Sequence, residues 1–288
     1  MAALAAVAAG CGGGDGDETT AATGGAEACA KDQLDLVNEG KLTIATGNPA
    51  FSPWFEGGTS GGSKFESNDP TNGQGYESAV AYALARELGF AKADVNWTAV
   101  PFNKTYAPGP KNFDFAMQQI SYSPQRARAV DFSRSYYDVN QALVAAEGSD
   151  IANATTVSEL KDAKLGVTVG TTGFDYVSNT IKPDSQASVY DDLAGNVAAL
   201  KNEQIDGLVT DFPTAYYIAN VQLENAKLVG RFPTAGEQEY FGLTFEKGNP
   251  LRTCVNRALD ALEADGTLDR LEQRWITSKA NAPLIQAG

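Results

Sequence analysis

The sequence contains no histidine, which removes the side chain that most often serves as a general base or a metal ligand in proteins. Catalytic triads that depend on histidine and histidine-bound zinc are therefore excluded. Basic residues are also few, with 22 Lys and Arg against 36 Asp and Glu, for a net charge of −14. A surface this negative repels phosphate backbones, so nucleic acid is not expected as a partner. An enzyme built from this sequence would have to use carboxylates, Lys, Tyr or Ser.

Cysteine is scarce as well, with three residues among 288. After the first ten residues, no apolar run in the sequence approaches the ~18 residues that a membrane span needs. The remaining composition is that of a globular protein, since 43% of the residues are hydrophobic and 20% are charged. Collagen-like, disordered and disulfide-framework classes are excluded.

The N-terminal residues differ in composition from the rest. A short apolar stretch ends in Ala-Ala-Gly-Cys at Cys11, and a tract rich in Gly, Ala, Thr and acidic residues follows. This pattern resembles the lipobox of a bacterial lipoprotein precursor, although the first basic residue is Lys31 and the basic region of a signal peptide is missing. The resemblance implies a signal-peptide remnant at 1–10, a lipidated Cys11 and a flexible tether at 11–30. The alternative is an unprocessed disordered tail with a chance cysteine.

The remaining 258 residues alternate between strand-like runs and amphipathic helices, which indicates an α/β fold with mostly parallel sheets and helices on both faces. Length and pattern together favour two domains. The closing segment is too short to stand alone, so we expect it to return to the first domain and to give two crossings between the domains. The expected strands are 41–46, 95–100, 113–120, 137–146, 164–169, 188–192, 205–210, 226–230 and 239–245. The main expected helices are 76–88, 192–202, 213–220, 249–264 and 267–277, with short helices from 123 and 173.

Six segments in this order carry a resemblance to a known family: PAFSPWFE, ISYSPQRARAVDFSRSYY, LGVTVGTTGFDY, NVAALKNEQIDGLVTD, FGLTFEKGNP and ALDALEADGTLDRLEQRW. Together they resemble the extracytoplasmic amino-acid-binding proteins of ABC importers. The resemblance implies a two-lobed, periplasmic-binding-protein-like fold, with lobe 1 at 31–141 plus 240–288 and lobe 2 at 142–239. Hinges are expected near 139–144 and 233–241.

The same resemblance implies a function. Such a protein binds an amino acid in the cleft between its lobes and delivers it to an ABC permease, as a monomer held by lipid on the outer face of the cell membrane. It implies no cofactor, no metal and no catalytic residue. An enzyme on the same scaffold, a dehydratase that relies on a carboxylate, remains the alternative, because a fold alone does not fix a function.

Arg126 and Ser121 match family positions that bind the carboxylate of the ligand. A planar guanidinium can hold a carboxylate through two parallel hydrogen bonds, which lysine cannot do. Ser123 and Pro124 are expected to start a helix whose free N–H groups point the same way. The alternative is a capped surface helix with a solvated arginine.

Gly170-Thr171-Thr172-Gly173 lies between an expected strand and an expected helix, where backbone N–H groups can bind an anion. The resemblance assigns the rest of the carboxylate contact to Thr172, and Thr171 is a further candidate; a tight strand-to-helix turn is the alternative. Asp211 ends a strand and matches the family position for the ligand's ammonium group. Its alternative role is to cap the helix that starts near Pro213.

Aromatic and amide side chains are expected to form the remaining wall. Phe51 and Phe102 match rings that enclose the ligand, although both could belong to the core. Amides at that end of the cleft favour a polar, uncharged amino acid such as glutamine or asparagine, unless Glu56, Glu77 or Lys104 reaches in and changes the charge preference. The three amides matched to the end of the ligand's side chain are Asn48, Gln118 and Gln119.

Cys29 and Cys254 are predicted to form a disulfide. If Cys11 carries lipid, two of the three cysteines remain, and export places them in an oxidising compartment. The alternative is a pair of buried free thiols.

Overall fold

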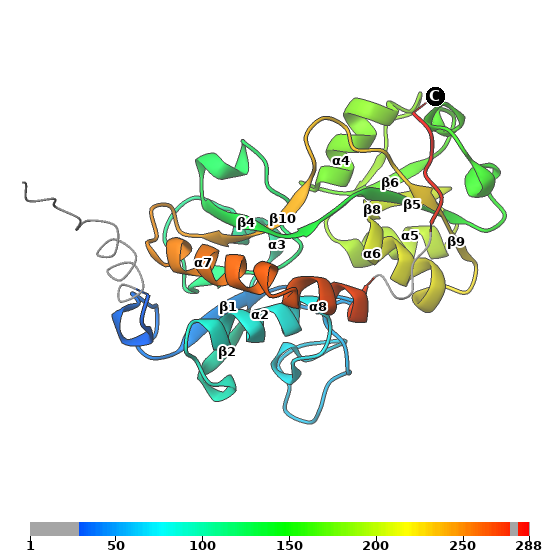
Figure 1. Ribbon diagram of the computed structural model, residues 1–288. Helices are drawn as coiled ribbons and strands as arrows, with labels where there is room; N and C mark the ends of the chain where they lie inside the picture. The colour runs from blue at the N-terminus through cyan, green and yellow to red at the C-terminus, as the bar shows by residue number, and fades with distance from the viewer. Residues whose placement is uncertain (1–28, 277–281, 288) are drawn as a thin grey trace, which may run out of the picture.

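The computed structural model describes residues 29–276 and 282–287, so Cys11 and most of the expected tether lie outside the described residues. Within them, two lobes lie side by side (Figure 1), each on a five-stranded sheet. The lobe 1 strands, in sheet order, are β2 (Val95–Ala99), β1 (Leu42–Thr46), β3 (Phe115–Ala116), β10 (Tyr240–Phe245) and β4 (Asp131–Asp138). The lobe 2 strands are β7 (Ser188–Tyr190), β6 (Leu165–Thr168), β8 (Gly207–Asp211), β5 (Gln141–Ala146) and β9 (Ala226–Arg231).

One strand in each sheet runs against the other four. In lobe 1, β1 pairs in parallel with β2 and β3, whereas β10 is antiparallel to β3 and β4. In lobe 2, β6 is parallel to β7 and β8, and β5 is antiparallel to β8 and β9. β10 and β5 are the strands that enter their lobe from the other one, so they begin where their neighbours end. The sheets are therefore mixed rather than mostly parallel in their pairing.

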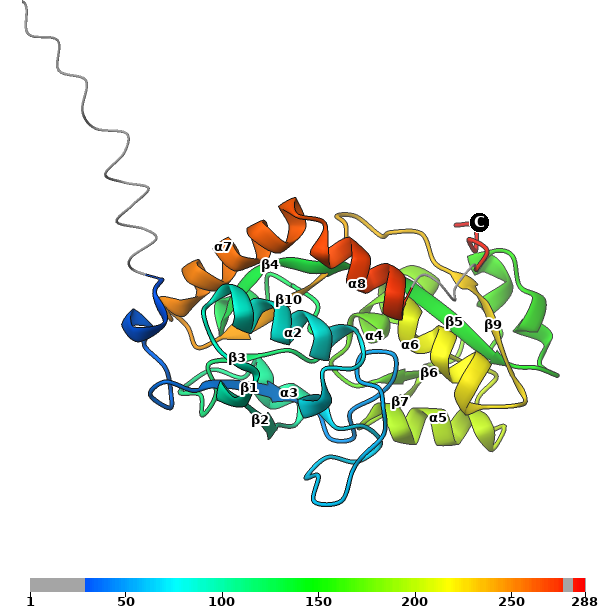
Figure 2. The same cartoon turned by 60° about the horizontal axis from the view of Figure 1, so that its bottom comes forward.

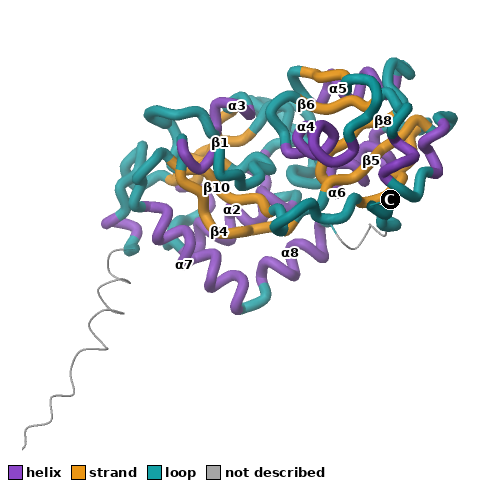
Figure 3. The backbone as a smooth tube through the Cα atoms, turned by 90° about the horizontal axis from the view of Figure 1, so that it is seen from above, coloured by secondary structure: helices purple, strands orange, loops and turns teal. Residues whose placement is uncertain are grey.

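Helices lie against both faces of the lobe 2 sheet and beside the lobe 1 sheet (Figure 3). Helix α7 (Leu251–Ala264) packs against β4 and against α2 (Tyr76–Glu87), because its buried residues recur at the spacing of one helix face. The other helices are α3 (Phe102–Thr105) and α8 (Thr267–Trp275) in lobe 1, and α4 (Thr172–Tyr176), α5 (Leu193–Lys201) and α6 (Phe212–Tyr217) in lobe 2. Among the described residues, no helix combines the length and the apolar character needed to cross a bilayer.

The chain passes between the lobes where hinges were expected. The first passage joins β4 to β5, and the second joins β9 to β10. They run side by side at one point, where the backbone N–H of Val139 donates to the carbonyl of Glu239 at 3.0 Å. Both expected hinge ranges overlap these passages.

The C-terminal residues depart from the expected division. Residues 282–287 lie on lobe 2, near the end marked C in Figure 1. There Leu284 bridges to Arg231 and Gln286 to Thr156. Ile285 is buried in the lobe 2 core. The range 240–288 therefore does not belong wholly to lobe 1. A segment this short has no periodicity that could have predicted its position.

Three expected local elements also differ. The strand expected at 113–120 is reduced to β3, and the run at 137–146 is divided between the end of β4 and the whole of β5. The helix expected at Ser123 is a single 3-10 turn, Arg126–Arg128. The hydroxyl of Ser123 accepts from the backbone N–H of Arg126 at 3.2 Å.

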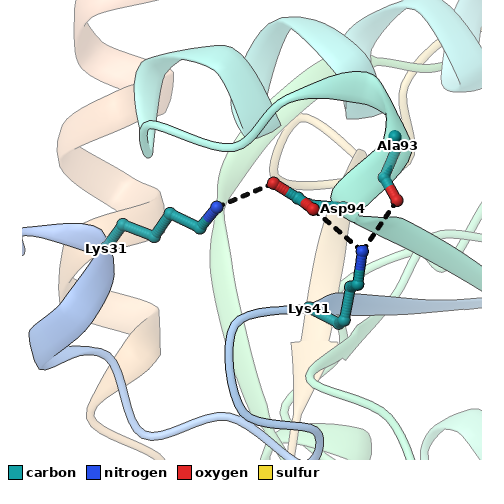
Figure 4. Close-up of polar contacts among 4 residues, drawn as sticks. All are labelled: Lys31, Lys41, Ala93 and Asp94. Atoms are coloured by element: carbon teal, nitrogen blue, oxygen red, sulfur yellow. Dashed lines mark hydrogen bonds and ion pairs between the residues drawn. The ribbon is translucent and has the colours of Figure 1, made fainter.

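The first described residues, from Cys29, lie against lobe 1 (Figure 2). Cys29 forms the predicted disulfide with Cys254 in α7. Figure 4 shows that the ammonium groups of Lys31 and Lys41 both contact the carboxylate of Asp94, at 2.7 and 2.8 Å. These hydrogen bonds lower the pKa of Asp94 to about 2.

Candidate ligand-binding site

Two adjoining cavities lie between the lobes, at the carboxyl ends of strands β1, β3, β6 and β8. Their volumes are about 580 and 50 Å³. This is where open α/β sheets place their ligands. The larger cavity is lined by Asn48, Phe51, Phe102, Gln118, Gln119, Thr171 and Asp211, and the smaller one by Ser121, Arg126 and Thr172. The structure therefore brings the ten predicted ligand-binding residues together, and their contact with a ligand stays a prediction.

Arg126 lies at the closed end of the site and is only 8% exposed. Its guanidinium donates to the carbonyl of Ser121 in lobe 1 and to the carbonyl of Gly170 in lobe 2, both at 2.6 Å. The guanidinium carbon also lies 4.4 Å from the centre of the Tyr106 ring, a cation–π distance. Burial lowers the pKa of Arg126, although an arginine stays charged in proteins. A fixed positive charge thus sits at the junction of the two lobes.

A carboxylate that the sequence analysis did not identify lies beside this arginine. Glu239 Oε1 accepts from the hydroxyls of Ser121 and Thr172 at 2.6 and 2.5 Å. The amide of Gln141 donates to both oxygens of the same carboxylate, at 3.2 and 3.1 Å. The polar end of the site is therefore a network that joins both lobes. Gln141 begins β5 and Glu239 directly precedes β10, and both fall within the expected hinge ranges. Their position at the hinges was the sequence signal that could have identified them.

The Gly-Thr turn serves the fold as well as the site. Gly170 has a φ of +71°, and the hydroxyl of Thr171 accepts from the backbone N–H of Phe174 at 3.2 Å, which caps α4. The tight strand-to-helix turn, which was the alternative interpretation of this motif, is therefore present. Thr172, one residue further on, is the one whose hydroxyl reaches the network around Glu239.

Asp211 is placed where it can fill both of the roles considered for it, as a helix cap and as a residue of the cleft. It ends β8 and caps α6, accepting from the backbone N–H of Thr214 at 3.0 Å, and it also lines both cavities. Burial raises the pKa of Asp211 to about 6, and the nearby carboxylate of Glu239 acts in the same direction. The surroundings of Asp211 therefore disfavour its negative charge, and a cation in the cavity would stabilise the charged form of this carboxyl group.

Glu77 is fully buried behind the cavity wall and fixes the position of Gln119. Its carboxylate accepts from the backbone N–H of Gln119 at 2.8 Å, from the Gln119 side chain and from the hydroxyl of Tyr136. Burial raises the pKa of Glu77 to about 7. Glu77 therefore does not reach into the cleft, and the amide nitrogen of Gln119 is engaged by it.

The segment at 57–74 is longer than the turn usual at this place in the family, and is called the insertion here. It supports the loop that carries Phe51. Asn48 Oδ1 accepts from the backbone N–H of Glu66 at 2.8 Å, and the amide of Asn68 donates to the carbonyl of Ala50 at 2.9 Å. The side-chain oxygen of Asn48 is thus already engaged in a hydrogen bond within the protein. Of the three predicted amides, Gln118 differs, since its Oε1 is buried and lacks a hydrogen-bond partner among the described residues.

Lobe 2 contributes two carboxylates to the larger cavity that were not assigned to it from the sequence, Asp191 and Asp192. Asp192 caps α5 by accepting from the backbone N–H of Gly195 at 2.8 Å, and Asp191 is exposed. Asp191, Asp192 and Asp211 thus line the larger cavity, and no Lys or Arg is among the described residues that line it. Within residues 29–276 and 282–287, no group of three His, Cys, Asp or Glu residues is arranged to hold a metal ion.

Comparison with known proteins agrees with this geometry. The family of bacterial extracellular solute-binding proteins, family 3, matches residues 58–278. The chain belongs to this family. Its membership confirms the family expected from the sequence motifs, and the family's name refers to an extracellular location.

Relatives of this chain are named for different amino acids. The chain is 25% identical over 217 residues to the ABC transporter glutamine-binding protein GlnH of Bacillus subtilis, covering 74% of this chain and 77% of that protein. It is 28% identical over 220 residues to the putative ABC transporter arginine-binding protein 2 of Escherichia coli, covering 74% and 86%.

Two solved structures extend the comparison. An ancestral arginine-binding protein bound to glutamine is 26% identical with a TM-score of 0.66, covering 83% of this chain and 98% of that one. An ancestral amino acid-binding protein described as a precursor of cyclohexadienyl dehydratase is 25% identical with a TM-score of 0.65, covering 83% and 96%. The two-lobed α/β fold expected from the sequence is thereby confirmed.

Proposed function

We propose that this family 3 protein captures a single amino acid between its lobes and delivers it to an ABC permease. The observation that carries the proposal is the pairing of opposite charges across one cleft. Arg126 from lobe 1 and Asp211 from lobe 2 line the same smaller cavity, and Asp211 also lines the larger one. A zwitterion placed between them gives each buried charge a partner, which offsets the cost of removing it from water.

Each end of the zwitterion has a proposed contact. Arg126, Ser121 and Thr172 bind the α-carboxylate, and Asp211 binds the α-ammonium. Because these residues come from both lobes, the ligand favours the closed arrangement, in which all of its contacts form at once. Phe51 and Phe102 line the cavity on lobe 1 and supply apolar walls.

We infer that the side chain of the ligand is cationic, as in arginine or lysine. The expectation of glutamine or asparagine depended on three amides, of which Asn48 and Gln119 are engaged within the protein. Asp191 and Asp192 instead place negative charge on the wall. Gln118 Oε1 and Thr46 Oγ1 are buried acceptors in the same wall without partners among the described residues, so they suit a donor-rich side chain.

A thermal-shift screen with the common amino acids tests both parts of this proposal. An amino acid present at 100 times its dissociation constant should stabilise the protein by about 2.7 kcal/mol. Arginine or lysine should give the largest increase in melting temperature. A larger increase with glutamine would reject the cationic preference and keep the amino-acid site. If every amino acid is silent, the amino-acid site itself is rejected.

We propose further that the protein acts outside the cytoplasm as a monomer, held at the membrane by lipid on Cys11. The Ala-Ala-Gly-Cys pattern supports the lipid, and the disulfide between Cys29 and Cys254 supports an oxidising compartment. Mass spectrometry of the N-terminal peptide from membrane fractions should find Cys11 modified with acyl chains. A Cys11→Ser variant should be released into the soluble fraction.

We infer that the protein performs no catalysis. The named relatives are binding proteins, whereas one structural neighbour is described as a precursor of a dehydratase, which keeps the enzyme alternative open to experiment. Incubation with the best-binding amino acid, followed by NMR of the small molecules, should return the ligand unchanged. A dehydrated or deaminated product would reject this inference.

A further inference from the structure

Glu239 stands where the two lobes and two of the chain's passages meet. It directly precedes β10, and its backbone carbonyl accepts from Val139 in the other passage. Its side chain contacts Ser121 on lobe 1 and both Thr172 and Gln141 on lobe 2, through the hydrogen bonds given above. One carboxylate thus joins the two lobes at the polar end of the ligand cavity.

The hydrogen-bond chemistry of this contact limits what the site can offer a ligand. A hydroxyl group has one proton to donate. In the structure, Ser121 and Thr172 both direct that proton to Glu239 Oε1, in short hydrogen bonds of the charge-assisted kind. While these bonds exist, neither hydroxyl can donate to the carboxylate of an amino acid.

We propose that Glu239 is an internal competitor of the ligand's carboxylate, which holds the lobes together in the absence of an amino acid and lowers the affinity for one. This inference builds on the proposed function, because it assigns Ser121 and Thr172 to the ligand's carboxylate. The ligand must displace the Glu239 side chain before it can use the two hydroxyls. Since Glu239 lies on a passage between the lobes, this displacement couples ligand binding to the hinge.

The charges around Glu239 support the competition. At Arg126 the Glu239 carboxylate opposes the lowering of the pKa by burial, and at Asp211 it adds to the raising of the pKa by burial. A second carboxylate beside Arg126 would share one positive charge with Glu239, and like charges at this distance repel each other. Moving Glu239 away therefore removes repulsion as well as competition for the hydroxyl protons.

The test compares Glu239→Gln with Glu237→Gln. Both variants remove one negative charge from the same passage, but Glu237 is exposed. Without amino acid, small-angle X-ray scattering should show a larger radius of gyration for Glu239→Gln than for the parent, and no change for Glu237→Gln. In calorimetric titrations with arginine, Glu239→Gln should bind about tenfold more tightly, since the ligand no longer breaks charge-assisted hydrogen bonds. Glu237→Gln should bind like the parent.

Several outcomes would overturn the proposal. Weaker arginine binding by Glu239→Gln would make Glu239 a supporting part of the site rather than a competitor, and an unchanged affinity and radius of gyration would leave it without a role. If Glu239→Gln does not fold, Glu239→Asp, whose carboxylate is drawn back by one methylene, should move both measurements in the same direction. If the parent binds no amino acid, the proposed function fails, and the radius of gyration still decides whether Glu239 holds the lobes together.

Discussion

The indole N–H of Trp54 donates a hydrogen bond of 2.9 Å to the hydroxyl of Thr214, and so joins lobe 1 to helix α6 of lobe 2. Trp54 is fully buried against Tyr137 and Phe241, with ring centres 5.4 and 5.5 Å away. The backbone N–H of Thr214 is bound by Asp211. Trp54 is therefore a core residue of lobe 1 that contacts α6. The same helix is capped by Asp211, the residue proposed to bind the ligand's ammonium group.

Replacing this tryptophan tests the contact between the lobes. Trp54→Phe should lower the free energy of unfolding by about 1 to 3 kcal/mol, through one lost hydrogen bond and a partly unfilled core position. Trp97→Phe is the matched control, because the Trp97 indole donates to Tyr82 within lobe 1 at 3.3 Å. Urea denaturation measures stability, and small-angle scattering measures the arrangement of the lobes. Trp54→Phe alone should change the scattering curve, and identical curves for the two variants would contradict a role between the lobes.

Arg126→Lys should weaken amino-acid binding by about 2 to 5 kcal/mol while the fold is kept. Lysine retains the charge, but it lacks the planar fork and the stacking against Tyr106. The exposed neighbour Arg128 offers a matched control as Arg128→Lys. Calorimetric titration gives the affinities, and circular dichroism checks the fold. Parent-like binding by Arg126→Lys would mean that the carboxylate contact has been assigned to the wrong residue.

The raised pKa of Asp211 predicts how binding depends on pH. An ammonium group binds the charged carboxylate, and the pKa of this carboxyl is about 6 because it is buried. Below that pH the carboxyl is protonated, so affinity should fall by up to about tenfold per pH unit between pH 6 and 5 and level off above pH 7. Asp211→Asn should bind more weakly at pH 8 and lose this dependence.

A second buried carboxyl serves as the control for that experiment. Glu77→Gln removes another buried carboxyl with a raised pKa, and it should preserve the pH dependence of binding. If Glu77→Gln abolishes the dependence and Asp211→Asn retains it, the titrating group has been misidentified.

Glu77 should also make stability depend on pH. Its pKa is about 7 in the folded protein against an ordinary value of 4.5, so the folded state holds more protons between these values. The free energy of unfolding therefore decreases as the pH rises through this window, by about 3 kcal/mol in total from Glu77. Urea denaturation at pH 5, 6, 7 and 8 should show the decrease in the parent and in the exposed control Glu237→Gln. Glu77→Gln should show a flatter profile, and an unchanged profile would contradict the prediction.

The disulfide gives a further test. A Cys11→Ser variant, denatured without reductant, should expose no reactive thiol, and reduction should release two. In the chain-entropy treatment a loop of 225 residues contributes roughly 5 kcal/mol, which is an upper figure. Reduction should accordingly lower the midpoint of urea denaturation. Two thiols that react before reduction would exclude the bond in the isolated protein.

The sequence located most of the fold and the site because strand ends have recognisable neighbours. The run that ends at Asp211 precedes Pro213, and this combination marks both the end of a strand and the start of a helix. The Gly-Thr turn at Gly170 is equally local. The ten predicted residues line two adjoining cavities, and most of them were assigned through the family resemblance rather than through such local patterns.

The sequence failed where an outcome depends on partners far along the chain. Whether the side-chain oxygen of Asn48 is already hydrogen-bonded depends on Glu66 in the insertion. Whether the side-chain amide of Gln119 is free depends on Glu77. Glu239 enters the site because two passages of the chain come together there. The position of residues 282–287 could not be predicted, because so short a segment has no hydrophobic periodicity. It depends on single contacts, such as that of Ile285 with the lobe 2 core.

The bond between Cys29 and Cys254 also makes the protein a covalent ring. Both passages described above, the whole of lobe 2 to β9 and the insertion at 57–74 lie within it. A protease that cuts any one of these loops opens the ring without releasing a fragment. A singly nicked molecule would therefore keep both lobes on one connected chain, and would separate into two pieces on a gel only after reduction.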